Sequence, residues 1–391
     1  MKFFAAILSL TVLLICSACT TSTPATSAGN GYLYLVTAGD TTLTAFTVAF
    51  GNGALAIDGS TVSTGQAPVA MVISPTGGAA FVANQTGKSV SVYGVNSDGS
   101  LVASNMALVA GTNPSALAID PAGKFLFVAN EGTSADPTSG TVSVYSMSNG
   151  TVSEVAGSPF PTEAVGATSG SGPVALVVPP VGNYLYVANR FASTVAAFSF
   201  DDTTGALTPV ANSPYATGLT PQGVAVSRDG NYVFVANTGS NNVSVFSICA
   251  AVSTTCLTPD GSMTPAGSPV SAGIGPIAFA IDQGFDFVYV LNYNSSSVSE
   301  YRYSPGTGGL TPLSPASVST GLNPTSLAVI SGATGTNIGN TVLDPVDYLF
   351  VANTGEATVT EFTLNTTSGT LGVVGQPTTT GGQPSAVATF Q

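Results

Sequence analysis

The sequence predicts an all-β protein, a seven-bladed β-propeller of four-stranded blades whose ring is closed when the C-terminal strand joins the N-terminal blade. Three observations support this prediction: two short motifs that recur along the chain, a pattern of four strand signals in each repeat, and chain ends that complement each other. The first motif is Gly-x-x-Pro, and its seven copies begin at Gly65, Gly111, Gly170, Gly218, Gly273, Gly321 and Gly381.

The second motif is an aromatic residue followed by Val-Ala-Asn, which is typical of the end of a strand. It occurs in full or nearly so at Phe81–Asn84, Phe127–Asn130, Tyr186–Asn189, Phe234–Asn237, Tyr289–Asn292 and Phe350–Asn353, with a degenerate copy at Tyr34–Thr37. Because one residue type recurs at an equivalent strand end, we interpret these asparagines as structural groups that bond turn backbone, rather than as a binding site.

Each repeat contains four strand signals separated by turn residues. In the repeat that follows Gly111 we expect strands at Ser115–Asp120, Phe125–Ala129, Thr141–Met147 and Thr151–Val155. Pro-Ala-Gly separates the first two and Asn-Gly the last two, and both are turn sequences. The second strand, Phe-Leu-Phe-Val-Ala, is apolar on both faces, so we expect it to be buried between blades.

The two ends of the repeat region complement each other. The chain begins at a second strand, Tyr32–Val36, and ends at a first strand, Ser385–Phe390. The C-terminal strand is therefore expected to complete the N-terminal blade, which would leave no blade unpaired.

The N-terminus resembles an export signal. Lys2 precedes an apolar stretch from Phe3 to Ile15, and the sequence Cys-Ser-Ala-Cys ends at Cys19. We interpret residues 1–18 as a signal peptide, Cys19 as the lipidated residue of a bacterial lipoprotein, residues 19–30 as a flexible tether, and residues 31–391 as the propeller. The alternative is an ordinary signal peptide with an incidental cysteine. The lipoprotein interpretation predicts a membrane-anchored protein that faces the periplasm or the cell surface.

Two cysteines remain, Cys249 and Cys256, in an enlarged hairpin between a third and a fourth strand. In an exported protein a disulfide is the expected state. A metal-binding or reactive thiol pair is the alternative, but no further ligand residue stands near them in the sequence.

Composition excludes several classes of function. Six residues are Lys or Arg against nineteen Asp or Glu, so there is no basic patch for nucleic acid. The chain contains no histidine, which excludes Ser-His-Asp and Cys-His catalysis as well as histidine-ligated zinc, haem and copper. It also lacks a phosphate-binding loop and an EF-hand. We expect no cofactor.

The Gly-x-x-Pro loops and the loops after Val-Ala-Asn should emerge on one face, around the mouth of the central channel. Polar residues expected there are Asp40, Gln85, Lys88, Asn113, Glu131, Glu163, Arg190, Gln222, Tyr293, Asn323 and Glu356. From them we select Glu131, Arg190, Asn113 and Gln222 as candidate ligand contacts, with Glu131 the one catalytic candidate. The alternative is a solvated ion pair between Glu131 and Arg190 that contributes little.

The repeated aromatic-Val-Ala-Asn strand, preceded by sequences such as Ser227-Arg-Asp-Gly230, resembles the YVTN-type propeller repeat. With Thr204-Gly-Ala-Leu-Thr208 in a hairpin, the pattern is similar to the seven-bladed lactonase family related to 6-phosphogluconolactonase, over about residues 31–391. The resemblance implies lactone chemistry. A site of the muconate-lactonising type combines His with Arg and Glu, and since this chain has no His, no catalytic residue is transferred.

Three functional hypotheses follow from these observations. The leading one is a monomeric, lipid-anchored propeller of the cell envelope that binds a small molecule, a glycan or a protein without catalysis. The second is a lactonase acting on a sugar lactone, in which a carboxylate such as Glu131 activates water. A third, calcium-assisted lactone hydrolysis, requires clustered oxygen ligands. An enclosed pocket containing both Glu131 and Arg190 would favour an enzyme.

Overall fold

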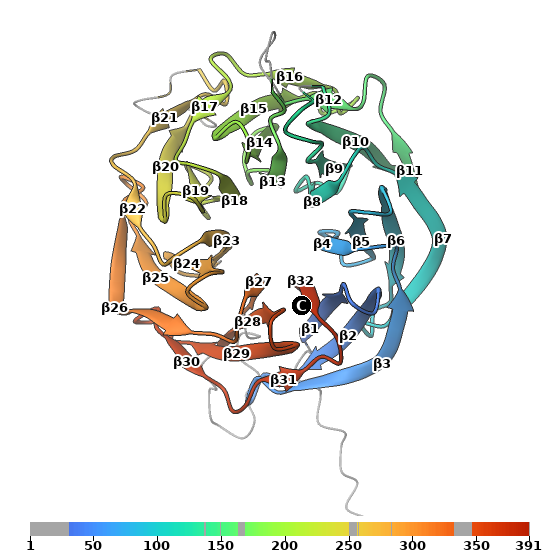
Figure 1. The fold of residues 1–391 in the computed structure, drawn as a ribbon, viewed down its shortest axis with the longest axis vertical. Coiled ribbons are helices and arrows are strands. Elements are labelled where there is room, and N and C mark those ends of the chain that lie inside the picture. The colour runs from blue at the N-terminus through green and yellow to red at the C-terminus, as the bar shows by residue number, and fades with distance from the viewer. Residues whose placement is uncertain are drawn as a thin grey trace, which may run out of the picture.

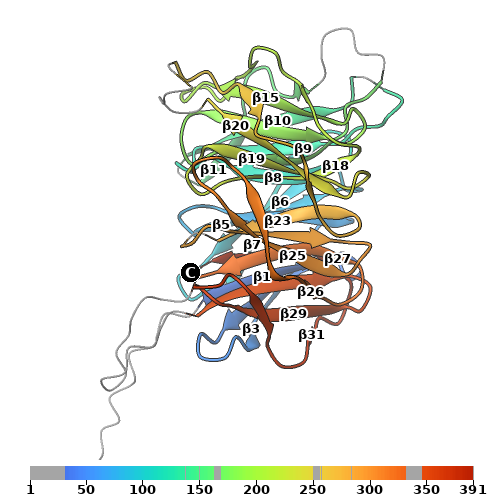
Figure 2. The same ribbon diagram turned by 90° about the vertical axis from the view of Figure 1, so that its left-hand side faces the viewer.

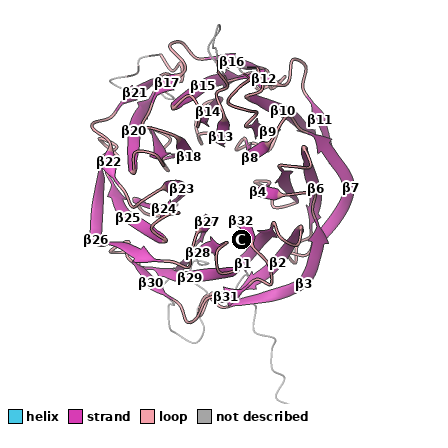
Figure 3. Cartoon of the chain, in the orientation of Figure 1, coloured by secondary structure: helices cyan, strands magenta, loops and turns pink. Residues whose placement is uncertain are grey.

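The computed structural model describes residues 31–390 except 137, 149, 163–168, 250–255, 257, 283 and 332–345. In this part of the chain every regular element is a strand, and the strands form seven sheets arranged in a ring (Figures 1 and 3). The described residues include no helix of the length and apolarity needed to cross a membrane. The predicted all-β, seven-bladed propeller is confirmed.

The seven blades follow one another along the chain. Blade 1 contains β1 (Gly31–Thr37), β2 (Thr42–Val48), β3 (Leu55–Ser63) and β32 (Pro384–Phe390); blade 2 contains β4 (Pro68–Ile73), β5 (Ala79–Asn84), β6 (Ser89–Val95) and β7 (Leu101–Val109); blade 3 contains β8 (Pro114–Ile119), β9 (Phe125–Asn130), β10 (Thr141–Ser148), β11 (Thr151–Glu154) and β12 (Phe160–Pro161); blade 4 contains β13 (Pro173–Val177), β14 (Tyr184–Asn189), β15 (Thr194–Phe200), β16 (Leu207–Pro209) and β17 (Tyr215–Ala216).

The remaining blades have the same order. Blade 5 contains β18 (Pro221–Val226), β19 (Tyr232–Asn237), β20 (Asn242–Ile248), β21 (Met263–Pro265) and β22 (Val270–Ser271); blade 6 contains β23 (Pro276–Ile281), β24 (Phe287–Asn292), β25 (Ser297–Tyr303) and β26 (Leu310–Ser319); blade 7 contains β27 (Pro324–Ile330), β28 (Asp347–Asn353), β29 (Thr358–Leu364), β30 (Leu371–Val373) and β31 (Thr378–Thr379).

Neighbouring strands of a blade pair antiparallel, and the strand that begins with the proline of Gly-x-x-Pro is innermost. Figure 1 shows β4, β8, β13, β18, β23, β27 and β32 around the centre of the ring, and each of them contacts the next. Seen from the side, the ring is a disc whose strands run between its two faces (Figure 2). The inner strands therefore determine which side chains line the central channel.

The fourth strand is less regular than the sequence suggested. In blades 3, 4, 5 and 7 it is split into two short strands that both pair with the third strand. In blade 3 the hydroxyl of Ser158, between the two pieces, accepts a hydrogen bond from the Val144 amide (3.0 Å), and in blade 4 Ser213 does the same for Ala197 (2.8 Å). A side-chain oxygen thus takes the place of a backbone carbonyl where the strand is interrupted.

The C-terminal strand closes the ring, as predicted. Strand β32 pairs with β1 over a register that runs from Tyr32 opposite Phe390 to Val36 opposite Ala386. The Ser385 hydroxyl also donates to the Pro68 carbonyl of blade 2 (2.7 Å). The first and last segments of the described chain are therefore joined within one sheet.

The hydrophobic core is divided into seven clusters, one at each junction between neighbouring blades. All six residues of β9 are buried, as the pattern Phe-Leu-Phe-Val-Ala predicted. Its Phe127 packs against Phe200 of the next blade, with ring centroids 5.2 Å apart. Since a second strand has a blade on either side, both of its faces leave water, and burial of aromatic rings supplies much of the driving force.

Three of the six strand-end asparagines bond turn backbone as the sequence indicated, whereas the amide oxygens of Asn189, Asn292 and Asn353 have no partner among the described residues. The amide oxygens of Asn84, Asn130 and Asn237 accept hydrogen bonds from the backbone N–H of Gly65, Gly111 and Gly218, at 2.9 to 3.1 Å. Their Nδ2 groups donate to polar side chains of the third strand, Asn130 to Thr141 and Ser143 for example. Each such side chain holds the Gly-x-x-Pro turn against its own blade.

Candidate functional site

One face of the disc carries two sets of loops. In all seven blades the residue after the strand-end position donates its N–H to the carbonyl of the residue before proline, as in Glu131 to Asn113 (2.9 Å) and Arg190 to Gly172 (2.7 Å). The expectation that both sets of loops share one face is confirmed. We call it the Gly-x-x-Pro face. The seven donor residues are Ala38, Gln85, Glu131, Arg190, Thr238, Tyr293 and Thr354.

A cavity of about 510 Å³ opens on this face at the channel mouth. It is bounded by side chains from blades 5, 6, 7, 1 and 2: Val69, Gln222, Thr238, Ile277, Tyr293, Asn294, Thr325 and Ser385. Five of these follow the proline of their inner strand directly, so the repeat itself places them at the mouth. We call this the mouth cavity. Its size suits a small-molecule site, which typically measures several hundred cubic ångströms.

The hydroxyl groups of the mouth cavity bond between blades. Thr238 donates to the Pro276 carbonyl (2.6 Å), Thr325 to Pro384 (3.1 Å) and Ser385 to Pro68 (2.7 Å). In each case the acceptor is the first carbonyl of the inner strand of the next blade, so these bonds hold neighbouring blades together at the mouth of the channel.

Three polar side chains of the cavity have hydrogen-bonding groups that no other described residue engages. The side-chain amides of Gln222 and Asn294 and the phenol of Tyr293 make no hydrogen bond to another residue in the part of the chain described. Together they offer two amide donors, two amide acceptors and one phenol. None of these groups is a carboxylate, ammonium or guanidinium, so the cavity can orient a polar molecule through hydrogen bonds rather than through ion pairing.

Glu131 and Arg190 form an ion pair between blades 3 and 4 on the same face. The Glu131 carboxyl is buried, whereas the Arg190 side chain is about one third exposed and lies over the Phe191 ring, 4.9 Å from its centroid. Burial raises the pKa of Glu131, and the Arg190 charge opposes this shift. The pair therefore joins a desolvated carboxylate to a cation that solvent can reach.

The other two candidates chosen from the sequence lie in different surroundings. Asn113 has a positive φ of 55° and donates from Nδ2 to the Gly132 carbonyl (3.1 Å), so it supports the loop that carries Glu131. Gln222 lines the mouth cavity. The structure thus places Glu131, Asn113 and Arg190 in adjoining loops of blades 3 and 4, while Gln222 belongs to a cavity whose lining does not include them.

Sequence reasoning gave no special weight to Tyr293 and missed Asn294 and Thr238. The repeat could have indicated two of them, since Thr238 and Tyr293 each follow the strand-end asparagine of their own repeat, as Glu131 and Arg190 do. All of these residues are neutral, so no charge in the sequence marks them. Glu163, another polar residue expected on this face, lies outside the described residues.

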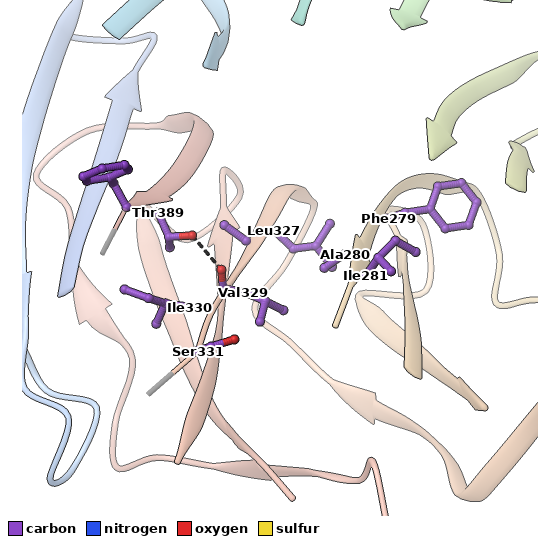
Figure 4. A pocket seen from close by; sticks show the side chains of 10 residues that line it. Phe279, Ala280, Ile281, Leu327, Val329, Ile330, Ser331 and Thr389 are labelled. Atoms are coloured by element: carbon purple, nitrogen blue, oxygen red, sulfur yellow. Dashed lines mark hydrogen bonds between the residues drawn. The ribbon is translucent and has the colours of Figure 1, made fainter. Parts of the chain in front are cut away.

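A second cavity, of about 640 Å³, opens at the other end of the inner strands (Figure 4). Its lining comes from the last residues of β23, β27 and β32 and is mostly apolar, with Phe279, Ile281, Leu327, Val329, Ile330 and Phe390 among the side chains. The Thr389 hydroxyl donates to the Val329 carbonyl (2.6 Å), as the dashed line in Figure 4 shows. Among the described residues that line it there is no Asp, Glu, Lys, Arg, Cys or Tyr, and the hydroxyls are those of Thr389 and Ser331.

Metal ligands do not gather anywhere in the described residues, where no group of three His, Cys, Asp or Glu side chains is close enough to hold an ion. Cys249 and Cys256 are joined by a disulfide, with Cα atoms 5.2 Å apart. Cys19 and the interpreted signal and tether, residues 1–30, lie outside the described part of the chain.

The model of the family described as lactonase, 7-bladed beta-propeller, matches residues 20–106 and 117–274, which is more than half of the chain. The chain belongs to this family. No curated protein sequence matches it.

Solved structures share the fold of this lactonase-family propeller at low sequence identity. A periplasmic gluconolactonase of Pseudomonas aeruginosa is 18% identical with a TM-score of 0.74, over 93% of this chain and 99% of that one. A putative 6-phosphogluconolactonase of Bacteroides uniformis is 16% identical with a TM-score of 0.73, over 93% of this chain and 100% of that one. A second, from Bacteroides fragilis, is 16% identical with a TM-score of 0.72, over 94% and 100%. These similarities establish the fold.

Proposed function

We propose that this lactonase-family propeller is a non-catalytic binding protein that holds a small, uncharged polar molecule in the mouth cavity. The observation that carries the proposal is the cavity lining, in which Gln222, Tyr293 and Asn294 provide hydrogen-bonding groups and the described residues include no Asp, Glu, Lys or Arg. Hydrogen bonds from side chains held in fixed positions at the mouth of the channel suit a neutral ligand such as a sugar or a sugar lactone.

The same lining argues against hydrolysis in the cavity. A general base has to lie within hydrogen-bonding reach of the water or proton on which it acts. The amides, hydroxyls and phenol of the mouth cavity are poor bases at neutral pH. Glu131 is the carboxylate proposed for this role, but it is buried against Arg190 and does not line the cavity.

Hydrolysis of a sugar lactone is the second candidate function, and one observation favours it. Glu131, with its raised pKa, stands beside the accessible guanidinium of Arg190 on the Gly-x-x-Pro face. In such a site Glu131 would accept a proton from water while Arg190 stabilised the oxyanion formed from the lactone carbonyl. Membership of the lactonase family and the gluconolactonase of similar fold add to this candidate.

Location in the cell envelope is also part of the proposal. The apolar N-terminal stretch, the cysteine at position 19 and the Thr/Ser/Pro/Ala-rich residues after it support export followed by lipidation. The similarity to a periplasmic protein is consistent with export. The propeller would then act as a monomer tethered to a membrane through Cys19.

The test combines binding and turnover on the purified protein. Binding of glucose and of glucono-δ-lactone is measured by ligand-observed NMR, and lactone hydrolysis is followed with and without EDTA. We expect binding that Asn294→Ala weakens and Glu131→Gln leaves unchanged, with hydrolysis at the rate of buffer alone. Hydrolysis well above that rate, abolished by Glu131→Gln, would overturn the binding proposal in favour of lactonase activity. Loss of turnover with EDTA would implicate a metal ion.

A further inference from the structure

Three large aliphatic side chains stand exposed beside the mouth cavity. Leu219, Ile274 and Leu322 are 63%, 58% and 54% exposed. They occupy the same position in blades 5, 6 and 7, directly after the glycine of Gly-x-x-Pro. Blades 1 to 4 have Gly382, Gln66, Thr112 and Ser171 there instead. We call the three residues the aliphatic rim.

Backbone bonds fix the rim next to the cavity. The Leu219 carbonyl accepts from Gly239 (3.0 Å), which follows Thr238, and the Ile274 carbonyl accepts from Asn294 (3.1 Å). The N–H groups of Leu219 and Ile274 are also bonded, to the hydroxyls of Ser240 and Ser295 (2.8 and 3.1 Å). Because backbone positions are held on both sides, the exposed side chains cannot withdraw without breaking these bonds.

Isolated exposed aliphatic residues are common on protein surfaces and need no explanation. These three differ because they occupy one repeat position in successive blades and adjoin a cavity that offers free hydrogen-bonding groups. An apolar patch next to such groups is typical of a ligand-binding surface. The rim residues thus lie on loops bonded to those that line the mouth cavity, and their exposed side chains favour contact with hydrocarbon.

Charge restricts the polar part of the ligand. On this face the loops of blades 7 and 1 carry the acids Glu356 and Asp40, which lie beside Gly321 and Gly382, and the loop between β5 and β6 of blade 2 carries Lys88. The chain as a whole has a formal charge of −13. A phosphate or carboxylate would meet repulsion here and no guanidinium or ammonium group in the cavity lining.

We infer that the ligand of the mouth cavity is a neutral amphiphile, with an uncharged polar head bonded by Gln222, Tyr293 and Asn294 and an aliphatic tail laid across the rim. This inference rests on the proposed function, since it names the class of molecule that the same site takes. Alkyl glycosides and acylated sugar derivatives belong to this class.

Two probes with one head group test the tail. Octyl β-D-glucopyranoside, kept below its micelle concentration, and methyl β-D-glucopyranoside are titrated into the full propeller and followed by ligand-observed NMR. We expect the octyl compound to bind at least about tenfold more tightly, since each buried methylene adds to affinity. The double variant Leu219→Ser/Ile274→Ser should remove this advantage and leave the affinity for the methyl compound unchanged.

A matched control and three outcomes make the test decisive. Ile57→Ser changes an isoleucine of β3 that is 66% exposed on the outer strand of blade 1, and it should leave both affinities unchanged. Equal affinity for the two probes, insensitive to the rim variants, overturns the amphiphile inference while the proposed binding function stands. If binding of the octyl compound is weakened by the rim variants but not by Asn294→Ala, the mouth cavity is not the binding site and the proposed function is overturned instead. Absence of binding by either probe at millimolar concentration overturns the inference.

Discussion

Glu131 and Arg190 occupy the same position in successive repeats, and they form an ion pair across the junction between blades 3 and 4. Elsewhere in the ring this position holds neutral residues such as Thr238 and Tyr293, which line the mouth cavity instead. One repeat position thus produces two environments on one face: a charged pair on one side of the channel and a neutral cavity on the other.

Removing the cation of this pair should destabilise the protein more than removing both charges. Arg190→Gln leaves the buried Glu131 carboxylate without its counter-charge, and we expect a loss of about 1–2 kcal/mol in the free energy of unfolding at pH 7. The double variant Arg190→Gln/Glu131→Gln should recover most of it. Urea denaturation measures the three proteins. Equal stability of the single and double variants would show that the pair contributes nothing beyond a solvated contact.

The ring should depend on its C-terminal strand. Deleting residues 385–391 removes nearly all of β32 and exposes the inner edge of β1, together with Leu33 and Leu35 of the junction between blades 7 and 1. We expect the thermal unfolding midpoint to fall by roughly 10 °C or more, or the cooperative transition to disappear. Differential scanning calorimetry checks this. An unchanged midpoint would contradict closure through this strand.

Two asparagines at equivalent positions should differ in their energetic contribution. Asn130 accepts a hydrogen bond from the Gly111 amide and donates to two hydroxyl groups. In the next blade the equivalent glycine, Gly170, donates to the Ser134 carbonyl instead. The amide oxygen of Asn189 therefore has no partner among the described residues. We expect Asn130→Ala to cost about 2–3 kcal/mol and Asn189→Ala distinctly less. Chemical denaturation of both variants provides the comparison, and equal losses would contradict it.

Stability should decrease as pH rises from 4.5 toward about 7 because of Glu300. This residue on β25 is fully buried, its Oε2 accepts from the Leu371 amide of blade 7 (3.1 Å), and burial raises its pKa to about 7 from 4.5. Between those two pH values the folded protein binds more protons than the unfolded chain, so the free energy of unfolding falls with rising pH, by up to about 3 kcal/mol.

The Glu300→Gln variant should lose much of that pH dependence, measured by urea denaturation at pH 5 and pH 8. Glu361 is the matched control because it occupies the same position in blade 7, and its pKa is also raised by burial. Thr378 donates to its carboxylate (2.6 Å), which opposes the shift, so Glu361→Gln should change the pH dependence less. An identical pH profile for the wild type and Glu300→Gln would refute the assignment.

Membrane attachment should depend on Cys19. If this residue carries the lipid, Cys19→Ser should move the protein from the membrane fraction to the soluble fraction of cells, since removing the acyl chains removes most of the affinity for a bilayer. Immunoblotting of fractionated cells measures the distribution. The variant Cys16→Ser controls for general effects on export. Continued membrane association of Cys19→Ser would contradict the lipoprotein interpretation.

Most of the fold could be predicted from the sequence because each repeat shows the same pattern of strands and turns. Seven Gly-x-x-Pro motifs, six strand-end asparagines and strands such as Phe125–Asn130 with two apolar faces all point to the same blade. The complementary ends then predicted the pairing of β32 with β1. The split fourth strands were not predicted. The hydroxyls of Ser158 and Ser213 accept the hydrogen bonds that backbone carbonyls of an unbroken strand would accept, and the local sequence does not indicate this exchange.

The candidate site was predicted only in part. The face was correctly inferred from strand order, and Gln222 lies in the mouth cavity. The selection of Glu131 and Arg190 rested on charge, which is visible in the sequence. The neutral groups of Tyr293 and Asn294 depend on which blades widen into a cavity, and this cannot be read from residue types alone.

By itself the sequence determined the number of blades, the order of strands, the buried faces and the closure of the ring, because each depends on periodicity and on the burial of apolar side chains. Only the tertiary structure decided which loop residues meet. Positions that are equivalent in the repeat lie at different angles around the channel, so their partners come from neighbouring blades rather than from their own. That is why Glu131 meets Arg190 while Tyr293 faces a cavity.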